Sequence, residues 1–216
     1  METYNSFSET FSNSRKNMKW PEMEYFMDFI KTIPEIADNN GKIQILDIGC
    51  GNGRLLNYLI PAGLDKSYFG IDSSDGMISE AIREFPDHKF ELLDMTDLSG
   101  FDGEKFDMIF LIASFHHLKT LTERQEVLSH INGILRSGGF VFMTNWNLFS
   151  EENSIRYKEI TEGSGNFDIK IGEYMRYYHG FNLDELKGLF DRSHFEIIEN
   201  RIFDNGRNII SILRKG

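Results

Sequence analysis

Short apolar runs alternate along the chain with segments whose apolar residues recur at helical spacing. The runs cover Ile43–Ile48, Tyr68–Ile71, Lys89–Leu92, Phe106–Ile112 and Gly139–Asn145. The spacing between them predicts helices near Arg54–Ile60, Asp75–Phe85 and Thr122–Leu135. Strands that alternate with helices form a parallel sheet with helices on both faces. We therefore expect an α/β protein built on a doubly wound, mostly parallel sheet.

The two ends of the chain depart from this alternation. Apolar residues at helical spacing predict an amphipathic helix over Trp20–Ala37, inside an N-terminal helical segment at residues 1–40. Later in the chain, helices are expected over Glu151–Glu162 and Asn182–Phe190, and a terminal strand pair over Phe195–Ile202 and Asn208–Leu213. No repeat or linker divides the sequence, so we expect residues 1–216 to form one domain.

The most informative motif lies at residues 45–54, which read Ile-Leu-Asp-Ile-Gly-Cys-Gly-Asn-Gly-Arg. Three glycines stand at alternate positions, Gly49, Gly51 and Gly53, which lets the backbone of a tight turn approach a ligand closely. A dinucleotide fingerprint, G-x-G-x-x-G, would need a glycine where Arg54 stands. The motif therefore argues against a nicotinamide dehydrogenase.

Asp47 precedes the first of these glycines by two positions, which completes a D-x-G-x-G-x-G pattern. The pattern resembles motif I of the class I S-adenosylmethionine (SAM) methyltransferases. The resemblance implies SAM as the cofactor and a seven-stranded, Rossmann-like sheet in the order 3-2-1-4-5-7-6, closed by an antiparallel terminal hairpin. In such a sheet the ligand lies beyond the carboxyl ends of the strands.

Residues at those strand ends are the candidates for binding SAM. Asp72 closes the second strand, where its carboxylate can accept both ribose hydroxyls. After the third strand, Asp94 can accept the adenine amino group and Met95 can cover the ring. Taken alone, Asp94 could also be a turn residue.

The remaining cofactor candidates lie at the centre of the sheet. Asp47 is expected to orient the amino-acid end of SAM, and the motif glycines Gly49, Gly51 and Gly53 to let it approach. Ile112 and Ala113, which follow the fourth strand, are expected to line the sulfonium pocket.

Composition and charge argue against several classes of site and partner. Cys50 is the single cysteine, which excludes an internal disulfide and argues against a cysteine-based metal site, and no metal is expected. No apolar run approaches the roughly 20 residues that span a bilayer, and the polar N-terminus is unlike a signal peptide, so we expect a cytoplasmic protein without a membrane partner. The formal net charge is −11, of which −9 falls in residues 1–150, so the overall charge does not favour nucleic acid.

Several separate blocks resemble the tRNA wobble-uridine carboxymethyl methyltransferases, which esterify 5-carboxymethyluridine in the anticodon. The blocks are Phe11–Arg15 with Trp20-Pro21, His116–Thr120 with Glu123-Arg124, Trp146, Arg176–His179 with Phe181 and Glu185-Leu186, and Asp204–Gly206. One extra residue precedes Trp20 and another precedes Glu123, and Asn208-Ile209 stands where Asn-Trp is expected. The resemblance implies a tRNA substrate and, as in the eukaryotic members, a small zinc-binding activator protein as partner.

The expected chemistry is consistent with the residue types in these blocks. A carboxylate is already ionised at neutral pH, so its methylation needs no general base. The site must hold the anion in line with the methyl group and exclude water. Arginine and histidine suit that task, with arginine the better bidentate partner. The candidate catalytic residues are Arg15, His116, Arg124, Arg176 and His179.

Alternatives remain at several of these positions. We favour His116 over His117 for the site, and Arg124 could equally be a solvated helix residue. If residues 176–179 are extended, Tyr177 and Tyr178 point in opposite directions and one of them packs inward.

Two other functions compete with tRNA modification. A methyltransferase for a small metabolite, acting on oxygen or nitrogen, agrees better with the acidic charge. A SAM-binding protein without catalysis would bind the cofactor and transfer no methyl group.

Overall fold

The computed structural model describes residues 20–34, 43–101, 103 and 106–216. Its main sheet has the order β3 (Lys89–Leu92), β2 (Tyr68–Asp72), β1 (Ile45–Ile48), β4 (Phe106–Ile112), β5 (Leu135–Trp146), β9 (Asn208–Lys215) and β8 (Phe195–Ile202). Neighbouring strands are parallel from β3 to β5, whereas β9 pairs antiparallel with both β5 and β8. This arrangement confirms the predicted order, with β8 and β9 as the terminal hairpin.

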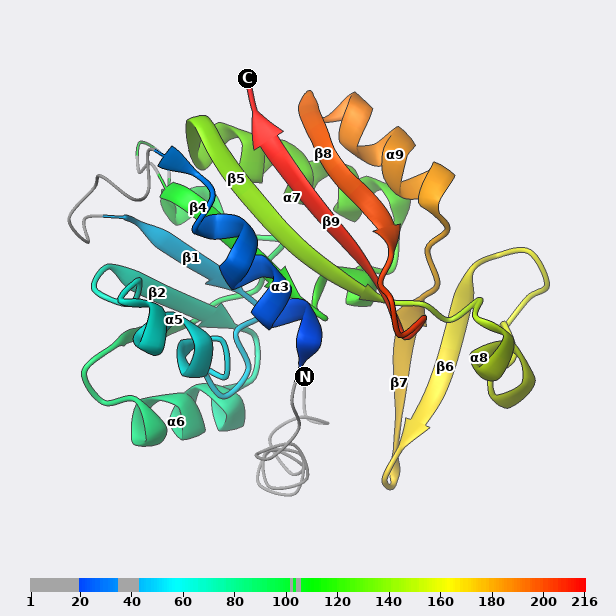
Figure 1. Cartoon of the computed structure of the whole chain (residues 1–216). Coiled ribbons are helices and arrows are strands. Elements are labelled where there is room, and N and C mark those ends of the chain that lie inside the picture. Colours follow the sequence, from blue (N-terminus) through cyan, green and yellow to red (C-terminus); the bar gives the residue numbers. More distant parts are fainter. Residues whose placement is uncertain (1–19, 35–42, 102, 104–105) are drawn as a thin grey trace.

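Helices cover both faces of the sheet, as the alternation predicts. Figure 1 shows α3 (Pro21–Ile30) in front of the sheet and α7 (Leu121–Ile134) behind it. Successive side chains of a strand point to opposite faces, so Phe110 of β4 belongs to the core under α3 and α5 (Leu56–Ala62). Its neighbour Leu111 belongs to the core under α7 and α9 (Leu183–Arg192). The strand interior is therefore buried on both sides, and polar side chains collect at the strand ends.

Helix ends follow local capping chemistry. Thr120 and Glu123 form a reciprocal capping box at the start of α7, and Ser74 caps α6 (Asp75–Glu84) by accepting a bond from the Met77 amide. Asn182 caps α9 in the same way. The predicted N-terminal helix is observed as α3, which ends at Ile30; the predicted residues 35–37 lie outside the described residues.

The segment between β5 and α9 differs from the prediction. The helix expected over Glu151–Glu162 ends at Arg156, as α8 (Glu151–Arg156). A two-stranded antiparallel ribbon then follows, β6 (Asn166–Ile171) and β7 (Tyr174–His179), which is separate from the main sheet. Two single-turn helices complete the structure, η1 (Ser99–Phe101) and η2 (Phe115–His117).

The ribbon has a small core of its own. Phe167 and Ile169 of β6 and Tyr178 of β7 are buried with Leu148. The intervening side chains of β6, Asp168 and Lys170, are exposed, so alternation along β6 separates a packed face from a solvent face. Figure 1 shows the ribbon projecting past the ends of the β5 and β9 strands.

Among the described helices, none combines the length and the apolar character needed to span a membrane.

We predict that the aromatic core under α3 carries a large part of the stability. Phe142 is fully buried and stacks on Phe110 with a centroid distance of 4.9 Å. Phe142→Ala should lower the free energy of unfolding by about 3–5 kcal/mol through lost burial and a residual cavity. The matched control, Phe149→Ala, removes the same side chain where it is 45% exposed and should cost about 1 kcal/mol or less. Urea denaturation measures both, and equal losses would contradict the assignment of the core.

Candidate active site

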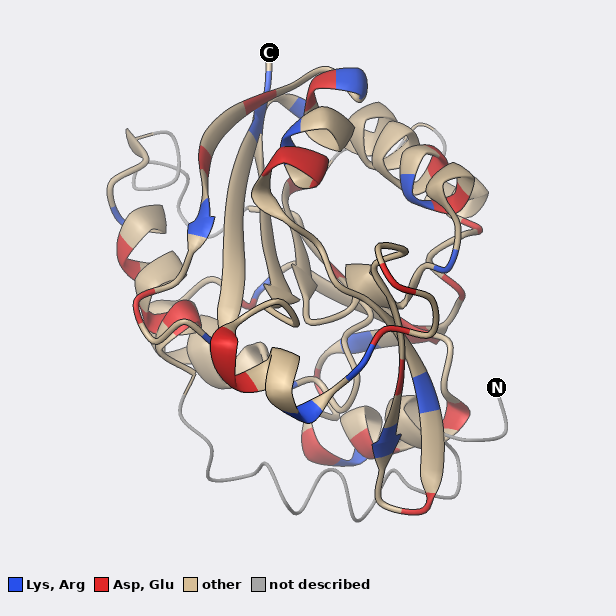
Figure 2. Cartoon of the chain, turned by 90° about the vertical axis from the view of Figure 1, so that its right-hand side faces the viewer, with Lys and Arg blue, Asp and Glu red and all other residues tan. Residues whose placement is uncertain are grey.

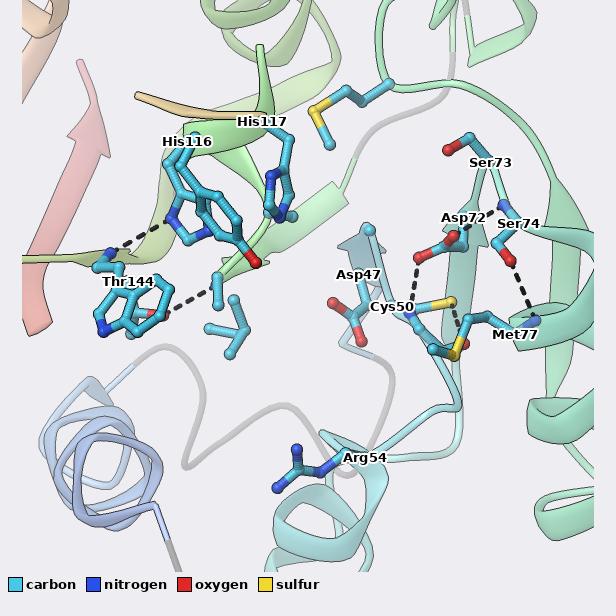
Figure 3. A pocket seen from close by; sticks show the side chains of 18 of the residues that line it. Asp47, Cys50, Arg54, Asp72, Ser73, Ser74, Met77, His116, His117 and Thr144 are labelled. Atoms are coloured by element: carbon cyan, nitrogen blue, oxygen red, sulfur yellow. Dashed lines mark hydrogen bonds between the residues drawn. The ribbon is translucent and has the colours of Figure 1, made fainter. Parts of the chain in front are cut away.

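A cavity of about 820 Å³ lies at the carboxyl end of the parallel strands. Its walls come from the segments that follow β1, β2, β3, β4 and β5, together with α3, β7 and the turn between β8 and β9. Figure 3 shows these side chains around a common space, with Asp47, Asp72 and Cys50 on one side and His116, His117 and Thr144 on the other. The cavity therefore has two ends with different chemistry.

The glycine turn after β1 is held against the neighbouring strand. The amides of Gly49 and Cys50 both donate to the Ile71 carbonyl, at 2.8 and 2.9 Å. Gly51 lines the cavity with a φ of +56°, and a Cβ built there would meet nothing within 4 Å. A side chain at Gly51 would thus occupy the cavity, which explains a glycine at this position.

Gly53 has a different role from the expected one. With a φ of +78°, it lies where a Cβ would come within 2.9 Å of the Phe85 ring, and it does not line the cavity. The residue therefore serves close packing of the turn against Phe85, not contact with a ligand.

Asp47 is a buried carboxylate with only one of its oxygens satisfied. Its Oδ2 accepts from the Tyr68 hydroxyl at 2.8 Å, whereas Oδ1 has no hydrogen-bond partner among the described residues. Burial raises the pKa of Asp47 to about 7, with a further increase from the charge of Asp72 and a decrease from the Tyr68 hydrogen bond. Figure 3 shows the carboxyl group turned toward the cavity. Its unsatisfied oxygen fits a cationic ligand group such as the ammonium of SAM.

Asp72 is fixed at the end of β2 by backbone donors. Its Oδ2 accepts from the Gly51 amide and its Oδ1 from the Ser74 amide, both at 2.9 Å. Burial raises its pKa, and these hydrogen bonds offset part of the increase. Each carboxylate oxygen retains a second lone pair for a further donor. The geometry therefore fits a carboxylate that receives two ribose hydroxyls, as predicted.

The other predicted cofactor residues also line the cavity. Asp94 and Met95 follow β3, and Ile112 and Ala113 follow β4. Asp94 also makes the turn contacts considered above, since its Oδ1 accepts from the amide and the hydroxyl of Thr96 at 2.9 and 2.8 Å. The cavity wall thus runs from a carboxylate and thioether at one end to the Asp47 carboxylate at its centre, which fits the shape and polarity of SAM.

The opposite end of the cavity is lined by aromatic rings and one arginine. Tyr178 of β7 packs against His117 at 4.7 Å and against His116 and Trp146 at 5.3 Å between ring centroids. The guanidinium carbon of Arg176 lies 5.4 Å from the Tyr178 ring centre. Burial lowers the pKa of Arg176 from its ordinary value, but an arginine remains a cation at neutral pH. This end can therefore hold an anion in partly apolar surroundings.

Both adjacent histidines line the cavity, and both are neutral. Burial lowers the pKa of His116 well below its ordinary value, and the neighbouring His117 lowers it further. Burial lowers the pKa of His117 to about 4, although its Nδ1 lies 3.0 Å from the Tyr177 carbonyl. His116 therefore carries no positive charge with which to hold an anion at neutral pH, and the two rings provide uncharged walls.

Arg124 and His179 lie behind the cavity wall instead of in it, which corrects their prediction as catalytic residues. Glu185 joins them: its Oε1 lies 2.8 Å from His179 Nε2 and accepts from Arg124 at 3.4 Å. Arg124 also donates to the carbonyls of Leu118 and Lys119. Both side chains are buried, and neither lines the cavity. They connect β7 to α7 and α9, and so hold the ribbon in place.

The tyrosine pair behaves as predicted for an extended segment. Tyr178 is buried, whereas Tyr177 is half-buried and its hydroxyl donates to Asn166 at 2.6 Å. Arg15, the remaining predicted residue, lies outside the described residues.

Three cations that line the cavity were not predicted as site residues: Arg54, Lys119 and Arg207. Arg54 was considered only as a departure from the dinucleotide fingerprint, although it immediately follows the glycine turn. Lys119 belongs to the block that contains the two histidines, so the resemblance of that block could have identified it as a site residue. Arg207 lies in the β8–β9 turn, and only the fold brings it to the cavity.

Within the part of the chain that the structure describes, no three His, Cys, Asp or Glu side chains are grouped to hold a metal ion.

Comparison with known proteins finds methyltransferases among the proteins that this chain resembles. Residues 46–141 match a family described as a methyltransferase domain. A tRNA (carboxymethyluridine(34)-5-O)-methyltransferase of Saccharomyces cerevisiae is 35% identical over 153 residues, which cover 71% of this chain and 49% of the yeast protein. A trans-aconitate 2-methyltransferase of Deinococcus radiodurans is 25% identical over 135 residues, which cover 62% of this chain and 48% of that protein. The chain thus spans about half the length of these two relatives.

The fold has close counterparts among solved structures. A SAM-dependent methyltransferase from Methanosarcina mazei superimposes with a TM-score of 0.68 at 24% identity, covering 84% of this chain and 97% of that one. At this level of identity the comparison establishes the fold.

We predict that ionisation of Asp47 controls the affinity for the cofactor. A pKa of about 7 means that Asp47 is mostly protonated at pH 5.5 and half ionised at pH 7.0. If the ammonium of SAM binds the ionised form, affinity for SAM should rise about tenfold between these values. The ligand's own amino group stays protonated there, because such groups titrate at about pH 7.7–8.0. Calorimetric titration across this range should show the rise in the wild type and a weak, pH-independent affinity in Asp47→Asn. A pH-independent wild type would contradict the prediction.

Proposed function

We propose that this chain, a SAM-dependent methyltransferase with the class I fold, transfers the methyl group to a carboxylate oxygen of its acceptor. When bound, SAM supplies an electrophilic methyl group on a sulfonium. The chain's own residues orient the cofactor through Asp47 and Asp72 and hold the acceptor at the aromatic end of the cavity. The observation that carries the proposal is the position of Arg176 among neutral rings at that end.

Arg176 and the aromatic rings at this end make different contributions to ester formation. The guanidinium can bind a carboxylate through two parallel hydrogen bonds, which fixes the direction of its oxygens. Tyr178, His117 and Trp146 provide the walls that exclude water, the competing acceptor. Holding the oxygen in line with the methyl group lowers the barrier without any proton transfer.

The protonation states at this end favour an acceptor that is already ionised. His116 and His117 have pKa values too low to accept a proton at neutral pH. Two carboxylates that also line the cavity accept hydrogen bonds from neighbouring residues of the chain. Glu123 accepts from the amides of Lys119 and Thr120, and Glu22 accepts from the side-chain amides of Asn205 and Asn208. An amine or alcohol would need a base, whereas a carboxylate does not.

For the acceptor itself we propose 5-carboxymethyluridine at the tRNA wobble position. The blocks that resemble the tRNA enzymes lie far apart in sequence, yet His116, His117, Trp146 and Arg176 line one cavity. The relative from yeast carries that activity in its name. Figure 2 shows both basic and acidic positions on the β6–β7 ribbon, whose basic residues are Lys170 and Arg176. Asp168 and Glu173 balance these two charges, so the ribbon itself adds no net positive charge to a chain whose net charge is −11.

A small carboxylate metabolite is the second candidate acceptor. The net charge of −11 disfavours a polyanionic substrate, and the relative from Deinococcus radiodurans is named for trans-aconitate, a small polycarboxylate. The same Arg176 would hold either acceptor.

We further propose that a small zinc-binding activator protein assists this chain if tRNA is the substrate. Such a partner could supply positive surface that the acidic chain lacks. Adding the candidate activator from the same organism should increase methyl transfer to tRNA and leave transfer to metabolites unchanged.

The test uses SAM labelled with tritium in its methyl group. The protein is incubated with fractionated small RNA and, separately, with small metabolites from its own organism. Label that enters tRNA and leaves as volatile methanol in mild base supports a methyl ester on tRNA. Base-labile label in metabolites alone supports the second acceptor. Label that resists mild base in every fraction, or no transfer at all, contradicts carboxylate methylation.

We predict that Arg176 is required for transfer and dispensable for cofactor binding. Arg176→Gln should lower kcat/KM at least 100-fold, because a charge-assisted bidentate pair is lost, while the affinity for S-adenosylhomocysteine changes less than threefold. Arg176→Lys keeps the charge without the planar fork and should recover only part of the activity. Arg136→Gln is the matched control, since Arg136 is an exposed arginine that does not line the cavity. Unchanged turnover in Arg176→Gln would overturn the assignment.

A further inference from the structure

The amino-acid end of SAM carries two opposite charges on one carbon, but the residues described so far account for only one of them. Asp47, with its unsatisfied Oδ1, fits the ammonium. The carboxylate beside that ammonium needs a cation on the same part of the wall. We propose that Arg54 binds the SAM carboxylate, so that Asp47 and Arg54 together recognise the amino-acid end. This inference rests on the proposed use of SAM and is independent of the acceptor.

The glycine turn brings Arg54 to the same part of the cavity as Asp47. Asp47 ends β1, the turn passes over Gly49–Gly53, and Arg54 follows directly; both side chains line the cavity. The turn is fixed by hydrogen bonds from the Gly53 amide to the Cys50 carbonyl at 3.0 Å and from the Asn57 amide to the Arg54 carbonyl at 3.2 Å. Figure 3 shows the Arg54 guanidinium extending into the space below the Asp47 carboxylate.

Trp20 holds the guanidinium of Arg54 in place. The Arg54 guanidinium carbon lies 4.1 Å from the centre of the Trp20 ring, within the range of a cation–π contact. The backbone amide of Trp20 donates to the hydroxyl of Tyr58, which belongs to α5, at 3.1 Å. Trp20 is therefore attached to the same helix that follows Arg54. A stacked guanidinium presents its N–H donors at its edge, in the plane that a carboxylate can approach with both oxygens.

Two of the other described cations that line the cavity lie near the aromatic rings of the acceptor end. Arg176 packs against Tyr178, and Lys119 follows the two histidines in η2. Arg207 lies in the β8–β9 turn, where its amide donates to Asn205 at 2.9 Å. Arg54 is thus the cation that the glycine turn itself brings to the wall of Asp47, whereas Arg207 reaches the cavity through the β8–β9 turn, whose Asn205 and Asn208 donate to Glu22 of α3.

The experiment compares three probes that differ only at the amino-acid end. S-adenosylhomocysteine carries both charges, S-adenosyl-3-thiopropylamine lacks only the carboxylate, and methylthioadenosine lacks both groups. Binding is measured by calorimetry for the wild type, Arg54→Gln, Asp47→Asn and the control Arg83→Gln. Arg83 is an exposed arginine of α6 that does not line the cavity, so its variant controls for a change in net charge.

Arg54→Gln should weaken binding of S-adenosylhomocysteine about 10- to 100-fold, as expected for a lost charge-assisted pair, and leave binding of the thiopropylamine within threefold. Asp47→Asn should weaken both of these probes, and neither variant should affect methylthioadenosine. If Arg54→Gln weakened binding of all three probes equally, Arg54 would have only a structural role. If it weakened binding of none of them, Arg54 would not contact the carboxylate. Either result overturns the inference. A wild type that binds none of the probes would instead refute the use of SAM.

Discussion

The cavity depends on a carboxylate that the fold keeps out of water. Asp47 ends the central strand, and the hydroxyl of Tyr68 on the adjacent strand satisfies one of its oxygens. Burial without full pairing disfavours the charged form, which is why its pKa rises to about 7. An approaching ammonium reverses that preference, because it supplies the missing partner. Burying the Asp47 carboxylate costs free energy when no ligand is bound. A cationic ligand that pairs with this carboxylate recovers part of that free energy, which adds to its affinity.

Everything else around the cavity is arranged relative to that carboxylate. Parallel pairing places the ends of β2 and β3 on one side of it, with the oxygens that suit a nucleoside, and the ends of β4 and β5 on the other. The β6–β7 ribbon closes the second side and contributes Arg176 and Tyr178. The partly buried contacts of Glu185 with Arg124 and His179 fix that ribbon to α7 and α9. The chemistry of the acceptor end thus depends on residues that never reach the cavity.

Much of the fold was predictable because its signals are local. Apolar runs and helical spacing predicted the alternation of strands and helices, and the resemblance of the glycine motif to class I methyltransferases implied the strand order and the candidate cofactor residues Asp47 and Asp72. The β6–β7 ribbon was missed although Phe167 and Ile169 alternate with polar residues, because two short strands outside the main sheet give a weak pattern. The sequence also could not show which polar side chains the fold buries. The sequence shows that His116 and Arg124 can carry charge, but only the three-dimensional packing neutralises His116 and pairs Arg124 with Glu185.

We propose that one cavity holds the cofactor at Asp47 and Asp72 and the acceptor at Arg176. A crystal structure with bound S-adenosylhomocysteine tests it most directly. We expect ribose hydroxyls on Asp72, the ammonium on Asp47 Oδ1, and the sulfur facing Tyr178, His117 and Arg176. A nucleoside bound among those rings, or a sulfur that faces away from Arg176, would show that the two ends of the cavity are assigned wrongly.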